Sequence, residues 1–130
     1  MKSRIKLMKV TSDMITLYGI PNCDKCRKAK KWFNENRIIF DFFDFRKNEL
    51  THAKIETWID RIGLDNLINR RGTTWRNLPE ELRDQISQPK NLDVLCQFPT
   101  LMKRPIIEMD DHFLVGFDAS VIKQIQIMKM

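Results

Sequence analysis

The chain has 130 residues, about the length of one domain. Hydrophobic residues make up 42% and charged residues 31% of it, which are ordinary values for a globular protein, and the low counts of four glycines and five prolines exclude a low-complexity chain. Its apolar runs are shorter than the roughly 18 residues of a membrane span, and its three cysteines, an odd number, argue against a secreted disulfide framework. We therefore expect a cytoplasmic protein without membrane partners.

Half of the net charge of +6 lies in the first thirteen residues, which contain four basic residues and one acidic residue. We expect residues 1–13 to be a flexible basic N-terminal extension, with Met14 as an alternative initiator, and residues 14–130 to form a single domain. The remaining excess is not accompanied by a recognition-helix motif, which argues against direct binding to nucleic acid.

The first part of the expected domain has the pattern of a β–α–β unit. Residues 14–18 favour a β-strand and are followed by turn-forming residues 19–22. Helical spacing of apolar side chains then predicts a helix that begins at Asp24 and ends near residues 34–37. Residues 38–45 are a near-continuous apolar run, which predicts a second strand buried on both faces, as in a parallel sheet.

The segment of about residues 50–98 is polar, helical in pattern and without a strand candidate. Thr51 can cap a helix that ends near Ile62, with Gly63 as its stop. Shorter helices are expected at three places: residues 64–68, from Pro79 onward, and residues 92–96.

The last part of the chain returns to β-structure. Two strand-like segments separated by two aspartates predict a hairpin, and a terminal helix follows; the segments are residues 105–109, 112–117 and 120–130. This order predicts an α/β, thioredoxin-like fold with a helical insertion between its βαβ and ββα parts.

Two cysteines, Cys23 and Cys26, lie at the turn from the first strand into the first helix. A thiol at a helix N-terminus meets unpaired N–H groups and the positive end of the helix dipole, which favour an anion. Together with Lys25, Arg27 and Lys28, this position should lower the pKa of Cys23 and enrich its thiolate. Cys26 lies one helical turn further on and can close a disulfide with Cys23.

The same spacing occurs in half of a four-cysteine zinc site. Zinc would need two more ligands, and the candidates Cys96, His52 and His112 are isolated in the sequence, so no metal is expected. Two buried, inert thiols are a further alternative, which the βαβ context disfavours. We interpret Cys96 as a buried bystander, and the two histidines as surface residues without a partner.

Two further segments have a composition suited to binding anions. Residues 69–76 contain three arginines, a glycine and two threonines, although a solvated basic loop would have the same composition. Arg104 and Pro105 precede the expected hairpin. In a thioredoxin-like order the proline at this position is commonly cis and lies against the active-site thiol, with Arg104 near it.

Four segments, in this order, resemble the motifs of the arsenate-reductase-like (ArsC/Spx) family and, more closely, of its YffB-like branch. They are Tyr18–Ala29, Asn69–Arg76, Lys103–Ile106 and Leu114–Phe117. The resemblance extends over about residues 14–125 and implies a thioredoxin-like fold with a helical insertion.

The resemblance also implies roles for individual residues. Arsenate reductases of this family use one cysteine, matched by Cys23, as the nucleophile on the oxyanion, and glutathione and glutaredoxin regenerate it. Arginines that hold the oxyanion are matched by Arg71, or by Arg70 in another register, and by Arg104 before Pro105. A third family arginine has no counterpart in the last strand region. The YffB-like branch implies a glutathione-dependent thiol reductase.

The leading hypothesis is accordingly a monomeric thiol oxidoreductase with glutathione as co-substrate and no bound cofactor. Cys23 would be the nucleophile and Cys26 the resolving thiol. Arg71 and Arg104 would hold a carboxylate or an oxyanion, and Pro105 would shape the groove beside the thiol. A second hypothesis is arsenate reduction coupled to glutathione and glutaredoxin. A third is a redox switch like the Spx regulators, which carry the same cysteine pair and bind the C-terminal domain of the RNA polymerase α subunit.

Overall fold

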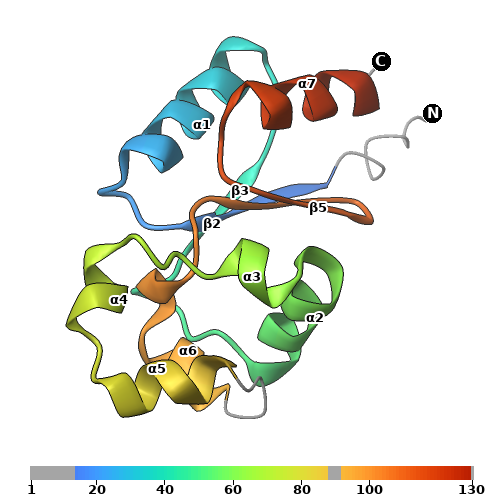
Figure 1. Ribbon diagram of the computed structural model, residues 1–130. Coiled ribbons are helices and arrows are strands. Elements are labelled where there is room, and N and C mark those ends of the chain that lie inside the picture. Colours follow the sequence, from blue (N-terminus) through green and yellow to red (C-terminus); the bar gives the residue numbers. More distant parts are fainter. Residues whose placement is uncertain (1–13, 88–91, 130) are drawn as a thin grey trace. The chain divides into compact units, whose positions relative to one another are not determined.

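Figure 1 shows the computed structural model, which describes residues 14–87 and 92–129. The expected basic extension and the last residue of the expected terminal helix lie outside the described residues. The chain divides into two compact units. The first unit comprises the residues up to Asp44 and those from Arg104 onward, and the second unit comprises Phe45–Lys103.

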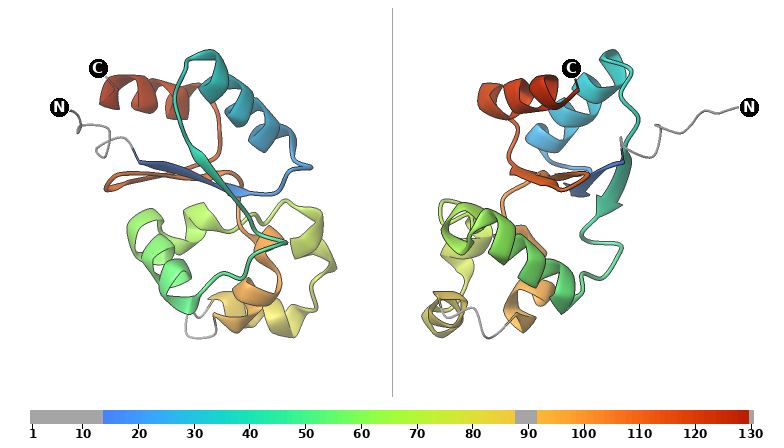
Figure 2. Two further views of the ribbon diagram at one scale, coloured as in Figure 1. Left: turned by 180° about the vertical axis from the view of Figure 1, so that it is seen from behind. Right: turned by 90° about the vertical axis from the view of Figure 1, so that its right-hand side faces the viewer.

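The first unit contains a four-stranded sheet and two helices. In chain order its elements are β2 (Ile15–Gly19), α1 (Asp24–Glu35), β3 (Asp41–Asp44), β4 (Ile106–Met109), β5 (His112–Val115) and α7 (Ala119–Met128). The strand order is β3-β2-β4-β5, with β2 parallel to β3 and the other neighbours antiparallel. Both helices cover the same face of the sheet (Figures 1 and 2). This arrangement confirms the expected α/β fold and the expected hairpin of β4 and β5.

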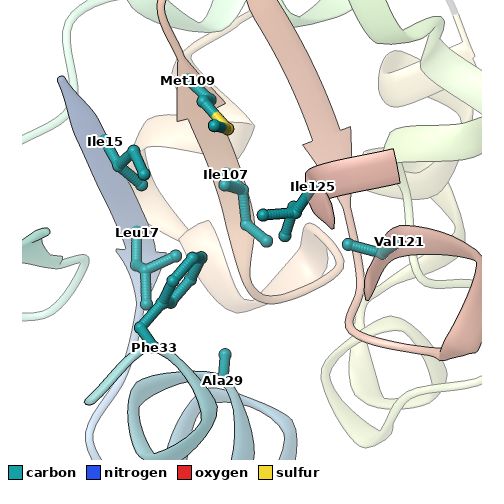
Figure 3. Packing of buried hydrophobic residues seen from close by; sticks show 8 residues of the cluster. All are labelled: Ile15, Leu17, Ala29, Phe33, Ile107, Met109, Val121 and Ile125. Atoms are coloured by element: carbon teal, nitrogen blue, oxygen red, sulfur yellow. The ribbon is translucent and has the colours of Figure 1, made fainter. Parts of the chain in front are cut away.

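The core of the first unit lies between the sheet and its two helices (Figure 3). Ala29 and Phe33 of α1 and Ile125 of α7 are fully buried against apolar side chains of β2 and β4. Full burial of a large apolar side chain such as Phe33 or Ile125 stabilises the fold by about 1.5–3 kcal/mol relative to leaving it exposed. The packing fixes α1 on the sheet, and with it the cysteine pair at the start of α1.

The prediction of a strand over residues 38–45, buried on both faces, is wrong in length and in burial. β3 covers Asp41–Asp44 and forms one edge of the sheet. Ile39 is 86% exposed, and Phe40 packs its ring on Phe33 of α1, 5.4 Å between centroids. The apolar run is longer than the strand because Phe40, which precedes β3, is apolar for its contact with α1 and not for a place in the sheet.

The second unit is helical, as the pattern of residues 50–98 predicts. Its elements are α2 (His52–Ile62), α3 (Leu64–Leu67), α4 (Thr73–Asn77), α5 (Glu80–Ser87), α6 (Asp93–Gln97) and the 3-10 helix η2 (Pro99–Leu101). Thr51 Oγ1 accepts a hydrogen bond from Lys54 N–H at 3.1 Å, and Gly63, at φ 94°, ends α2. Trp58 is fully buried beside Phe45. Within the described residues, no helix is long and apolar enough to cross a membrane.

Candidate active site

Cys23 is the residue that caps the N-terminus of α1. Its backbone is extended, at φ −145° and ψ 125°, and its carbonyl accepts the N–H of Arg27 at 2.9 Å. The side chain is half-buried and carries a free thiol. The first cysteine therefore lies where the sequence pattern predicts it, at the end of a helix that favours a negative charge.

Cys26 lies one turn further along α1 and is fully buried, also as a free thiol. Its sulfur packs against the end of β2, where a Cβ atom on Gly19 would overlap it. Burial raises the pKa of Cys26 to about 12, and the charge of Cys23 adds to this. A hydrogen bond from the backbone N–H of Ile20 acts in the opposite direction without offsetting burial.

The pKa of Cys23 is shifted in the opposite direction to that of Cys26. Burial raises its pKa, but the backbone N–H and the thiol of Cys26 both donate hydrogen bonds to its sulfur and lower it. Arg104 donates a further hydrogen bond and adds a positive charge. Because these contributions together exceed the cost of burial, the pKa of Cys23 lies below its ordinary value. The accessible sulfur is thus the one that ionises more easily.

The basic residues of α1 are not the cause of this low pKa, contrary to the sequence-based expectation. Arg27 pairs with Asp24, and Lys25 and Lys28 are exposed to solvent. Solvent screens charges in such positions, whereas Arg104 contacts the sulfur directly. The charge that matters for Cys23 comes from a residue 81 positions away in the chain.

Arg104 and Pro105 lie in the same unit as the two thiols. The Arg104–Pro105 peptide bond is cis, as expected, and Pro105 is buried. The carbonyl of Pro105 accepts the N–H of Gly116 at 2.8 Å. Gly116, at φ 85°, thus joins the end of β5 to the proline segment, in the region where the family's third arginine has no counterpart.

Arg71 belongs to the second unit, so its expected role toward Cys23 stays a prediction. The local geometry favours Arg71 over Arg70 as the anion-binding residue. Arg70 forms an ion pair with Asp65 at 3.3 Å and lies 5.5 Å over the ring of Trp75. The side chain of Arg71 is exposed, while its backbone N–H bonds to Asn69 Oδ1.

The segment after Arg71 differs from the loop that its composition suggests. Thr73–Asn77 form the short helix α4, in which Thr74 Oγ1 lies 2.9 Å from Thr100 Oγ1. Glycine and threonine have low helix propensity, so the sequence pattern does not indicate this helix. Contacts within the second unit stabilise it instead.

Two of the remaining candidate ligands, Cys96 and His52, have hydrogen-bond partners within the second unit. Cys96 is half-buried rather than buried, and its thiol donates to the carbonyl of Leu50 at 3.5 Å. Burial raises the pKa of Cys96, and so do nearby carboxylates, which makes it a poor nucleophile. His52 Nε2 lies 2.8 Å from Asp93 Oδ1, so the expectation that it lacks a partner is wrong.

His112, by contrast, is exposed as expected. Among the residues that the structure describes, no three histidine, cysteine or acidic side chains gather as a metal site would require.

Gly19 has a role that the sequence pattern, which indicates only a turn at this residue, does not reveal. The residue is the last of β2, and its lack of a side chain makes room for Cys26 Sγ. A glycine at the end of a strand, a few residues before a cysteine pair, is the signal that could have indicated this close approach.

Comparisons with known proteins show the family of this chain. The model of the ArsC family matches residues 18–125. An uncharacterized protein of Haemophilus influenzae is 42% identical over 105 residues, which cover 81% of this chain and 92% of that protein. The global transcriptional regulator Spx 1 of Lactococcus lactis is 30% identical over 115 residues, covering 85% and 87%.

A solved structure of a YffB protein matches with a TM-score of 0.77 and 28% identity, covering 85% of this chain and 96% of that one. It confirms the thioredoxin-like fold with a helical insertion. A solved structure of an arsenate reductase (ArsC) related protein from Brucella melitensis is 32% identical, with a TM-score of 0.67, and covers 87% of this chain and 94% of that one. On the extent of the family match, which includes both cysteines, Arg71, Arg104 and Pro105, this chain belongs to the ArsC family.

Proposed function

We propose that this protein is a thiol–disulfide oxidoreductase in which Cys23 is the nucleophile and Cys26 the resolving thiol. One observation carries the proposal: an accessible thiol with a lowered pKa receives a hydrogen bond from a fully buried thiol with a raised pKa. A thiolate is the reactive form of cysteine, so the ionised sulfur of the pair is also the one a substrate can reach.

The chemistry proceeds in two exchanges. The Cys23 thiolate attacks one sulfur of a substrate disulfide, the substrate S–S bond breaks, and the departing thiolate takes up a proton. Cys26 then loses its proton and attacks the Cys23 sulfur, which releases the second substrate thiol. The substrate gains two electrons, and the protein is left with a Cys23–Cys26 disulfide.

Forming the mixed disulfide prepares the second exchange. The charge of Cys23 is one cause of the raised pKa of Cys26, and this charge disappears once Cys23 is bonded to the substrate. The positive charge of Arg104, which lowers the pKa of Cys26, remains. Cys26 therefore ionises more easily in the intermediate than in the free protein.

We propose glutathione as the reductant that restores the two thiols, with glutaredoxin as an alternative. Two glutathione molecules would reduce the Cys23–Cys26 disulfide in two successive exchanges, and they would leave as glutathione disulfide while their thiol protons pass to the two cysteines. Arg104 would bind a glutathione carboxylate once Cys23 no longer carries a charge, Arg71 would bind a second one, and Pro105 would shape the groove. The resemblance to the YffB-like branch supports this assignment, in which the protein acts as a cytoplasmic monomer without a bound cofactor.

The test is the reduction of a glutathionylated peptide in the presence of glutathione. Cys23→Ser should abolish the activity, Cys26→Ser should reduce it less because glutathione can resolve the intermediate, and Cys96→Ser is the matched control that should retain it. Equal rates for the wild type and Cys23→Ser would exclude the proposal.

A redox-dependent regulator is the second candidate, favoured by the 30% identity to a protein named as a global transcriptional regulator. A regulator of this kind would bind the C-terminal domain of the RNA polymerase α subunit in one oxidation state. A pull-down with oxidised and with reduced protein decides between the candidates, and absence of binding in both states would remove the regulator.

Arsenate reduction is the remaining alternative within the family. Cys23, Arg71 and Arg104, which match family residues, support it, and Arg104 donates a hydrogen bond to Cys23. The segment Val115–Phe117 contains no third arginine, which opposes it. An arsenate assay supplied with glutathione and glutaredoxin tests it, and no turnover at saturating arsenate would exclude it.

A further inference from the structure

The positive charge of the folded chain is concentrated on a single helix. Residues 14–130 contain 19 basic and 16 acidic side chains, and α1 alone contains five basic and two acidic ones. Subtracting the helix leaves 14 basic and 14 acidic side chains, so the rest of this segment has no net charge. Cys23 is the N-cap of the same helix, which makes the charge asymmetry relevant to what approaches the thiol.

The basic side chains of α1 cover its solvent-exposed side, opposite the core-facing Ala29 and Phe33. We call this surface the basic face of α1; it consists of Lys25, Arg27, Lys28 and Lys31, all exposed. Arg27 is paired with Asp24, whereas Lys25, Lys28 and Lys31 have no ion pair among the described residues.

Lys30, at the border of the face, lies 4.0 Å from the ring centroid of Phe42 instead of facing solvent. Lys28 and Lys31 are separated from Cys23 by five and eight residues, which corresponds to about 8 and 12 Å along a helix axis.

We propose that the basic face of α1 binds acidic surfaces of protein substrates and thereby brings their disulfides to Cys23. The inference rests on the proposed oxidoreductase function. A nucleic acid would also suit the charge, but it carries no disulfide for the thiol at the end of the same helix. A protein can offer both an acidic surface and an electrophilic sulfur within the span of the helix.

Charge complementarity of this kind acts mainly on the rate of association. Steering raises association rates by about 10- to 1000-fold at low ionic strength, and salt removes the effect because charges are screened beyond about 10 Å at 0.1 M. For a face with three lysines that form no ion pair within residues 14–87 and 92–129, we expect a preference near the lower end, about tenfold.

The experiment compares three disulfide-containing peptides of equal length, flanked by four glutamates, four glutamines or four lysines. For each protein variant, kcat/KM for the acidic peptide is divided by kcat/KM for the neutral one. The variants are Lys28→Gln/Lys31→Gln and a control pair with the same loss of charge, Lys47→Gln/Lys123→Gln, whose lysines are exposed outside α1. Cys23→Ser reports whether the neutral peptide is reduced by the proposed chemistry.

The expected ratio is about ten for the wild type and the control pair at low salt, about three for Lys28→Gln/Lys31→Gln, and below two in 0.5 M salt. A ratio near one, or a preference for the lysine peptide, would overturn docking while leaving Cys23-dependent chemistry intact. Reduction of the neutral peptide at equal rates by the wild type and Cys23→Ser would instead refute the proposed function. A ratio near one combined with binding of a short DNA duplex that Lys28→Gln/Lys31→Gln abolishes would assign the face to nucleic acid.

Discussion

Replacing Gly19 by alanine should disturb the reactive pair without altering either cysteine. An added Cβ atom would overlap Cys26 Sγ and would lie 3.8 Å from the Cβ atoms of Cys26 and Arg104. The backbone of Gly19 is not in the left-handed region, so the conformation itself suits alanine. The cost of the substitution is therefore one of space.

Two responses can relieve the overlap, and each has a measurable size. If α1 moves away from β2, the overpacked core costs about 1–3 kcal/mol of unfolding free energy. If the Cys26 side chain rotates instead, its sulfur leaves the N–H of Ile20 and no longer donates to Cys23. Losing one hydrogen bond to a charged group costs about 1.5 kcal/mol of stabilisation of the thiolate, so the pKa of Cys23 should rise.

Chemical denaturation measures the first response, and the pH dependence of Cys23 alkylation measures the second. Cys26→Ala provides the matched background, because it removes the sulfur that the new methyl group would meet. Gly19→Ala should therefore cost markedly less in that background than in the wild type, and it should leave the pKa of Cys23 unchanged there. Equal losses of unfolding free energy in both backgrounds, together with an unchanged pKa in the wild-type background, would refute the reasoning.

Two further predictions follow from the same pair. Arg104→Gln should raise the pKa of Cys23, because both a hydrogen bond and a positive charge are lost, and Arg104→Lys should raise it less; an unchanged alkylation profile would contradict this. Since the pKa of Cys26 is raised from 9.0 to about 12, the folded state keeps this proton at pH values where the unfolded state loses it. Unfolding free energy should then fall between pH 9 and 12 by at most about 1.4 kcal/mol per pH unit more than in Cys26→Ala, and identical profiles would disprove the shift.

Features that depend on neighbouring residues could be predicted from the sequence. The cap at Thr51 and the stop at Gly63 are signals within one helical turn, and the structure contains both. The placement of Cys23 at a helix N-terminus follows in the same way from the turn residues before it and the helical spacing after it. These elements form largely because local hydrogen bonds and backbone preferences favour them.

Features that depend on residues far apart in the chain could not be predicted in this way. The apolar run before β3 indicates burial, but only the three-dimensional packing shows that Phe40 contacts α1 and that Ile39 is exposed. The side chain of His52 contacts that of Asp93, which is 41 residues away in the chain. The sequence pattern points to the basic residues of α1 as the cause of the low pKa of Cys23 for the same reason, because Arg104 approaches the thiol only in the folded protein.

The position of Arg104 bears on both exchanges of the proposed reaction. Its charge lowers the pKa of Cys23 in the free protein and also lowers the pKa of Cys26. Cys26 is fully buried, so it cannot be the sulfur that first attacks a large substrate. It can react only after Cys23 has formed the mixed disulfide with the substrate. In that intermediate Cys23 carries no charge, so its contribution to the raised pKa of Cys26 is lost. The charge of Arg104, which lowers the pKa of Cys26, remains. One arginine can thus favour ionisation of the two sulfurs in the order in which the reaction needs them.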